Sequence, residues 1–443
     1  MEQTQTMIMR LPNEILDSIL QLTMQLPLSS LNDIGVSRAA VNLSRVCRRF
    51  HGIATPYIYA HLLIYCNNDI MALSNTVYEF QRQFRSNQLC RSKLLHRTLQ
   101  KNPQLWQHCR NLKIELFNDS DSLGNIFIAT DAVTWLTGVT NLSISSEGRT
   151  TTDAMALVRS ALGGMKELIS LSVKDVSGDG IDLPLIVDAI CCSGKVARLK
   201  TLNISGISRT GNSADWAKLR EIRGTASFTE LTLHSFLQTP EALKSLLMWP
   251  ARLDKFTLDT SFRCDYALNG LYDQWGLDTL QPILTVHKST LSAIRIRALN
   301  RSGLDGFNLS GFQALRELSL SHGLTGTDPT LVAGLLSPRL RSFHWDMTFE
   351  DQQHDEFFFH FGEPEENWLR KLAMAAIGRK STLEIISIKF RPTDGEWGCT
   401  VYPWDRMDDV ARYVQPYGIR LFYTTPTISR ELFLEAQEFY GTR

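Results

Sequence analysis

The side chains that could carry out chemistry are few, and their spacing follows no established catalytic pattern. His354, Asp355, Glu356 and His360 could be drawn as a metal site, but their spacing matches no known ligand motif. The sequence contains no phosphate-binding glycine loop, zinc-protease helix motif, serine-hydrolase elbow or cysteine–histidine catalytic pattern. We therefore expect a non-catalytic chain with no cofactor and no metal. An enzyme whose site is assembled from distant parts of the chain stays open as an alternative.

Polar and charged side chains at regular intervals are better candidates for binding another protein. They follow short alternating apolar segments, and the later ones are larger and more often charged than the earlier ones. Simple solubility of an exposed strand face would explain them equally well. The predicted substrate-binding residues are Asp259, Arg295, Arg297, His344, Asp346 and Lys389.

The elements that must position these residues belong to a repeat. An apolar residue, two others, an apolar residue, one other and an apolar residue recur ten times, and Ile419, Leu421 and Tyr423 form a degenerate eleventh copy. Most copies are close to the spacing of about 20–29 residues that is typical of leucine-rich repeats, or slightly above it. The central residues of the copies are Leu112, Leu142, Leu171, Leu202, Leu231, Phe256, Ile294, Leu318, Phe343 and Ile386.

Each copy predicts a short strand with one buried face, and the residues between copies leave room for a helix. Helices are expected at 152–158, 183–192, 214–222, 241–249 and between Pro329 and Pro338. We predict an α/β solenoid, with a parallel sheet on its concave face and helices on its convex face. An ordinary α/β domain is the alternative, but such sheets seldom reach ten strands.

Composition narrows the class of protein. The chain has 443 residues, 43% of them apolar, with 46 Lys plus Arg against 46 Asp plus Glu. Neutrality makes nucleic-acid binding unlikely as a general function, because that affinity depends on excess positive charge. The charge is nevertheless uneven, since 80–114 holds eight basic and no acidic residues while 345–369 holds eight acidic and no basic ones.

The sequence shows no sign of export or membrane insertion. Its first residues lack the basic flank and apolar core of a secretory signal, and no run of about 18 apolar residues occurs. The eight cysteines form no CxxC pair. We expect a chain with reduced cysteines, located in the cytoplasm, the nucleus or both.

The block at 11–59 does not fit the repeat, and three motifs stand in it in order. They are Leu11-Pro12-x-Glu14-Ile15-Leu16, then Val46-Cys47-Arg48-Arg49-Phe50, then Ala54-x-Pro56-Tyr57-x-Tyr59. Together they resemble the F-box, and an F-box followed by leucine-rich repeats is similar to many fungal F-box proteins. The block could also be only a helical cap for the solenoid.

The resemblance implies a substrate receptor of an SCF-type ubiquitin ligase. Such a protein binds the Skp adaptor, and through it a cullin, and holds a protein client of unknown identity. The alternative is a scaffold that binds the adaptor or other proteins without a role in ubiquitin transfer. The resemblance assigns adaptor binding to Leu11, Pro12, Ile15, Leu16, Val46, Cys47 and Phe50.

Three regions are therefore expected. Residues 1–60 would form the F-box, and 61–108 a helical linker that caps the solenoid. Residues 109–443 would form ten to eleven repeats, with insertions near 260–290 and 346–382. Long insertions between repeats often lie on a binding face.

Overall fold

A computed structural model of the chain describes most of its residues. The described residues are 11–25, 40–67, 79–118, 125–148, 151–175, 180–192, 198–207, 219–260, 275–297, 299, 302–348, 361–392 and 401–441. They fall into two compact units, one of residues 1–179 with 185–199 and the other of residues 180–184 with 200–443. We describe each unit by itself.

The first unit begins with helices and continues as a parallel sheet in which strands β1 to β4 follow their order in the chain. Helix α8, Leu183–Cys192, contains the boundary between the units in the sequence. The other elements are α2 (Asn13–Gln25), α4 (Arg48–Ala60), β1 (His61–Asn67), α5 (Glu79–Lys101), η2 (Pro103–His108), β2 (Asn111–Asn118), α6 (Ile126–Trp135), β3 (Asn141–Gly148), α7 (Thr151–Gly164) and β4 (Ser170–Asp175).

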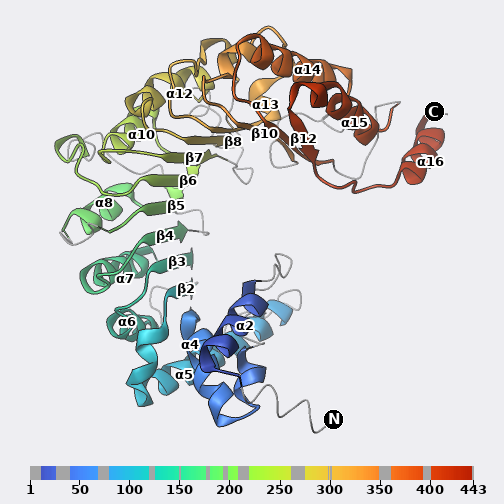
Figure 1. The fold of residues 1–443 in the computed structure, drawn as a ribbon. Helices are drawn as coiled ribbons and strands as arrows, with labels where there is room; N and C mark the ends of the chain where they lie inside the picture. The colour runs from blue at the N-terminus through green and yellow to red at the C-terminus, as the bar shows by residue number, and fades with distance from the viewer. Residues whose placement is uncertain are drawn as a thin grey trace. The chain divides into compact units, whose positions relative to one another are not determined.

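The second unit is a longer version of the same arrangement, in which β5 to β12 are parallel and follow their chain order. Helices α10, α12, α14 and α15 cover one side of this sheet (Figure 1). Its strands are β5 (Thr201–Ile207), β6 (Glu230–Phe236), β7 (Lys255–Asp259), β8 (Ala293–Arg297), β9 (Glu317–Ser321), β10 (Ser342–Thr348), β11 (Ile385–Arg391) and β12 (Arg420–Tyr423). Its helices are α10 (Pro240–Leu247), α12 (Leu277–Leu284), η4 (Thr285–His287), η5 (Leu304–Gly306), α13 (His322–Thr325), η6 (Val332–Leu335), α14 (Glu363–Gly378), α15 (Pro403–Val414), η8 (Gln415–Tyr417) and α16 (Arg430–Gly441).

The strand register agrees with the spacing of the apolar copies in the sequence. In the first unit the central residues Leu112, Leu142 and Leu171 are direct partners in neighbouring strands. In the second unit the partner series runs from Leu202 through the remaining copies to Leu421 of the degenerate eleventh copy. These central residues are buried, with the exception of Leu421, which is half-buried. An α/β solenoid-like arrangement of parallel strands and helices follows from this register.

The backbone repeats along with the side chains. In most copies, the carbonyl of the residue before the strand accepts two successive N–H groups from the next copy. Arg110 O, for example, accepts from Thr140 N at 2.8 Å and from Asn141 N at 3.0 Å. The same pair of bonds recurs at Ser292 O and Arg316 O in the second unit. Where this pair of hydrogen bonds occurs, it helps to fix the register of a strand on the strand before it.

Two features of the structure differ from the sequence prediction. The region 61–108 was expected to be helical, but it starts with β1, in which Leu62 and Ile64 are buried partners of Leu112 and Ile114. The helix expected between Pro329 and Pro338 is only the short 3-10 helix η6. The two prolines and Gly334 in this interval disfavour a longer helix.

The predicted insertions contain regular elements of the repeat. Helix α12 lies within 260–290 and helix α14 within 346–382. Part of each insertion, including the cluster from His354 to His360, lies outside the described residues. Phe361 ends the aromatic run of the second insertion, and it is fully buried next to Phe390.

Candidate functional site

The six predicted substrate-binding residues lie in two adjacent rows on β7, β8, β10 and β11. Alternation along the strands puts them on the face opposite the helices, because their neighbours Leu258, Ile294, Ile296 and Trp345 are buried on the other side. The structure therefore brings all six to one face of one sheet, as the sequence predicted.

Four of the six residues are paired with one another. Asp346 Oδ2 lies 3.1 Å from Arg297 Nη2 and 3.4 Å from Lys389 Nζ. Arg297 Nη1 is also 3.4 Å from Asp259 Oδ2, which in turn lies 3.5 Å from His234 Nδ1. The side chain of Asp346 is only 3% exposed and that of Arg297 12%. Two acidic and two basic side chains thus form ion pairs on this face of the sheet. These ion pairs connect β7, β8, β10 and β11.

Arg295 and His344 are in the other row and have no part in that network. Arg295 is exposed and makes no hydrogen bond or ion pair with the residues that the structure describes. Burial lowers the pKa of His344, and the positive charge of Arg295 lowers it further, against an opposing effect of Glu317. His344 is therefore a neutral imidazole at pH 7, able to both donate and accept a hydrogen bond.

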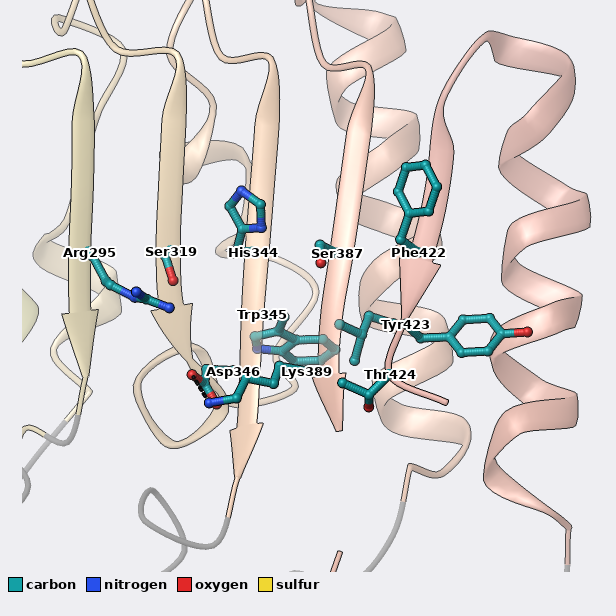
Figure 2. A pocket seen from close by; sticks show the side chains of 11 residues that line it. Arg295, Ser319, His344, Trp345, Asp346, Ser387, Lys389, Phe422, Tyr423 and Thr424 are labelled. Atoms are coloured by element: carbon teal, nitrogen blue, oxygen red, sulfur yellow. Dashed lines mark hydrogen bonds and ion pairs between the residues drawn. The ribbon is translucent and has the colours of Figure 1, made fainter. Parts of the chain in front are cut away.

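The row that contains Arg295 crosses five strands in register. Ser319 is the partner of both Arg295 and His344, and Ser387 is the partner of both His344 and Phe422. Figure 2 shows these five side chains side by side on β8 to β12. We call Arg295, Ser319, His344, Ser387 and Phe422 the central row.

A hollow of about 330 Å³ opens along the central row and is bounded on its other side by Asp346, Lys389 and Thr424. Ser319 is buried and its Oγ has no hydrogen-bond partner among the described residues, and Asp346 Oδ1 also lacks one. Buried polar atoms are normally paired, so these two atoms mark a place where a bound molecule could supply the missing bonds.

Phe422 was missing from the predicted site, although it closes the central row. Its side chain is 51% exposed, which is unusual for a phenylalanine on a sheet. The eleventh copy of the repeat is degenerate, so its spacing gives only a weak signal for the residue between its apolar positions. Aligning Leu421 with Ile386 would have identified Phe422 as the next member of the row.

A second candidate site is the pair of helices at the start of the first unit. Leu16, Leu20, Phe50 and Ala54 are buried. Tyr57 Oη donates to Asp17 Oδ1 at 2.6 Å, which joins α4 to α2. Arg49 of α4 donates through Nε to Asn13 Oδ1 at 2.7 Å and through Nη2 to the carbonyl of Leu11. These contacts fix the two helices on each other.

Several apolar side chains are exposed on α2 and on the turn before α4. Ile15, Ile19 and Leu22 follow one another on one side of α2 at helical spacing, and their side chains are 46%, 45% and 65% exposed. Val46, in the turn that precedes α4, is 63% exposed. We call Ile15, Ile19, Leu22 and Val46 the exposed apolar surface. It is a feature that soluble proteins usually reserve for a partner.

The residues assigned to adaptor binding divide into three groups by their exposure. Pro12, Ile15 and Val46 are exposed, whereas Leu16 and Phe50 are buried and can only support a surface. Leu11 and Cys47 are half-buried. The helical spacing of Leu43, Val46 and Phe50 in the sequence predicts one continuous helix, but Cys47 is extended and caps α4 by accepting from Phe50 N at 3.5 Å. The resemblance does not assign Ile19 and Leu22 to adaptor binding, although their helical spacing from Ile15 places them on the same side of α2.

The comparisons with known proteins leave the family open. No protein-family model matches the chain, and no curated protein is significantly similar to it. Among the described residues, no group of three or more His, Cys, Asp or Glu side chains is placed to hold a metal ion. No helix in the described part of the chain is both long and apolar enough to cross a membrane.

Proposed function

We propose that this protein is a substrate-recognition subunit of an SCF-type ubiquitin ligase. Residues 11–59 would dock on the Skp adaptor as an F-box, and the leucine-rich repeats would bind a protein client for ubiquitination. The observation that carries the proposal is the exposed apolar surface within the block that resembles an F-box. Exposed aliphatic side chains on α2 and on the turn before α4 are best explained by a protein partner that covers them.

The proposed mechanism needs no chemistry from this chain. The adaptor and its cullin would bring a ubiquitin-charged enzyme, and the repeats would hold the client within its reach. The rate gain then comes from proximity, because the two reactants no longer need to meet by diffusion. The cytoplasm or the nucleus, where these complexes act, is the proposed location.

Co-purification of the full chain with a recombinant fungal Skp adaptor tests the first half of the proposal. Ile15→Ser combined with Val46→Ser should weaken adaptor binding by about 100-fold, since each buried aliphatic side chain contributes about 1–2 kcal/mol to an interface. Both side chains are exposed, so the folded chain should keep its stability. Leu94→Ser is the matched control, because Leu94 is 61% exposed on α5 but lies outside the F-box block.

The outcomes separate the three interpretations. Undiminished binding by the double variant would refute docking through this surface, and failure of the unaltered chain to bind the adaptor would favour a different class of protein. Adaptor binding without assembly of a cullin complex would favour the scaffold. A complex that transfers ubiquitin to a protein bound on the repeats is the result that the proposal expects.

A further inference from the structure

We propose that the central row binds an extended protein segment in which a carboxylate side chain and a large apolar side chain are six residues apart. Arg295 would hold the carboxylate and Phe422 the apolar side chain. This inference names the chemistry of the client and rests on the proposed function only for the claim that the bound protein is ubiquitinated.

The charge of the hollow is concentrated at Arg295. Lys389 also lines the hollow, but its ammonium is held by Asp346 at 3.4 Å. Arg295 is exposed and has no ion-pair or hydrogen-bond partner among the described residues. Glu317 belongs to the neighbouring row and lies outside the lining of the hollow. An anionic group is therefore the natural ligand for the Arg295 end.

The chemistry of the anion follows from the same surroundings. Phosphate groups are usually held by clusters of arginines, which can match two negative charges. Here a single guanidinium is flanked by the hydroxyl of Ser319 and by the neutral ring of His344. One cation with neutral hydrogen-bonding neighbours suits a single negative charge, which is that of an Asp or Glu side chain.

The other end of the central row is formed by the ring of Phe422, and the guanidinium carbon of Arg420 lies 5.8 Å from the centroid of this ring. The Phe422 side chain is 51% exposed and contributes to the lining of the hollow, so a ligand could bury a large part of its ring. Between the two ends lie two serines and His344, which are small or able to hydrogen-bond. Ser319 Oγ has no partner among the described residues and can bond to a peptide backbone.

The geometry of the sheet sets the spacing within the ligand. Arg295 is on β8 and Phe422 on β12, so four inter-strand spacings, or about 19 Å, separate their positions. An extended peptide advances about 3.3 Å per residue and therefore covers this distance in about six residues. Side chains six positions apart in such a peptide lie on the same face, whereas those five apart lie on opposite faces. Only the even spacing presents both side chains to the sheet.

Fluorescence anisotropy with labelled Gly-Ser peptides and the full-length chain tests the inference. Each peptide carries one glutamate and one phenylalanine, six or five residues apart, and is made in both orders. One order of the six-residue spacing should bind with a Kd on the order of 100 µM, as is common for short peptides with two anchors. The five-residue spacing should bind at least tenfold more weakly in either order.

Variants of the protein test the two anchors separately. Arg295→Gln and Phe422→Ser should each weaken binding of the six-residue peptide by about tenfold, and Glu317→Gln should strengthen it by about twofold. Arg339→Gln is the matched control, because Arg339 is also exposed and unpaired among the described residues but lies outside the hollow. All of these side chains are exposed, and circular dichroism with thermal unfolding confirms that each variant is folded.

The inference is wrong if no peptide binds, if both spacings bind equally, or if Arg295→Gln binds as well as the unaltered chain. Replacing glutamate by phosphoserine distinguishes the two anions, and tighter binding of the phosphopeptide by more than tenfold would refute the carboxylate assignment. Adaptor binding is measured in a separate assay on a different surface. Failure of the peptide assay with intact adaptor binding would therefore leave the proposed function standing.

Discussion

Removing the charge of Asp346 should destabilise the second unit more than any comparable change at an exposed acid. Its side chain is 3% exposed and lies between Arg297 and Lys389 on the sheet face. The substitution Asp346→Asn keeps the shape of the side chain but removes a carboxylate charge 3.1 Å from the guanidinium of Arg297, which is 12% exposed and keeps Asp259 at 3.4 Å. A buried cation that loses one of its carboxylate partners is the source of the expected cost.

The expected loss in the free energy of unfolding depends on the interactions that Arg297 and Lys389 keep after the substitution. Removing one partner from a buried ion pair typically costs about 3–5 kcal/mol. Here Arg297 keeps Asp259, and the other partner of Asp346, Lys389, is 41% exposed and can return to water. We therefore expect a loss of about 2 kcal/mol in the free energy of unfolding. Arg297→Met in the Asp346→Asn background should cost less than the sum of the two single substitutions, because no guanidinium is then left beside the neutral amide, although Asp259, 8% exposed, loses its contact with Arg297.

Urea unfolding followed by tryptophan fluorescence measures the effect. Trp345, the neighbour of Asp346, is fully buried and stacks on Trp368 with ring centroids 4.6 Å apart, so it contributes to the change in tryptophan emission when this part of the second unit unfolds. Asp305→Asn is the control, because Asp305 is exposed, and it should change stability by less than about 0.5 kcal/mol.

Two results would refute the reasoning. A change below about 0.5 kcal/mol for Asp346→Asn would mean that the network is too well hydrated to contribute to stability. Strict additivity of Asp346→Asn and Arg297→Met would mean that the two side chains do not interact, whatever their separation of 3.1 Å.

Two further predictions concern the second unit. Burial raises the pKa of Glu365, but hydrogen bonds from His322 at 3.2 Å and from Gly362 N at 2.8 Å lower it by more, so the net shift is downward. The ionised carboxylate therefore contributes fully to stability above about pH 4.5, and this contribution is lost as the pH falls through the lowered pKa. Glu365→Ala should therefore cost about 2 kcal/mol at pH 7, and the difference from the unaltered chain should shrink below pH 4.5 in urea melts; an equal difference at all pH values would contradict this. Gly303 has φ +57°, and a Cβ there would come within 3.0 Å of Asp278 N. Gly303→Ala should lower the free energy of unfolding by about 1–3 kcal/mol, whereas Gly311→Ala, with open space around it, should be neutral; equal thermal stability of the two variants would argue against strain at Gly303.

The sequence by itself determined the repeated strands and their register. A strand exposes alternate residues on opposite faces, so the spacing of Leu318, Phe343 and Ile386 is enough to predict which residues are buried and which share a face. The same logic predicted that Arg295, Arg297, His344 and Asp346 lie on one face. Periodicity is a local property of the chain, which is why it can be deduced without a structure.

Only the tertiary structure decided which of those charges are available to a ligand. Whether Arg297 reaches Asp346 depends on side chains from two strands that are not adjacent and on the solvent they exclude, and neither follows from spacing along the chain. The separation of Ile15, which is exposed, from Leu16, which is buried, likewise depends on where α4 packs against α2. The sequence predicted which residues share a face of the sheet, because alternation along a strand is a local property. Which of those residues are paired or buried depends on contacts between distant parts of the chain, so only the structure could show it.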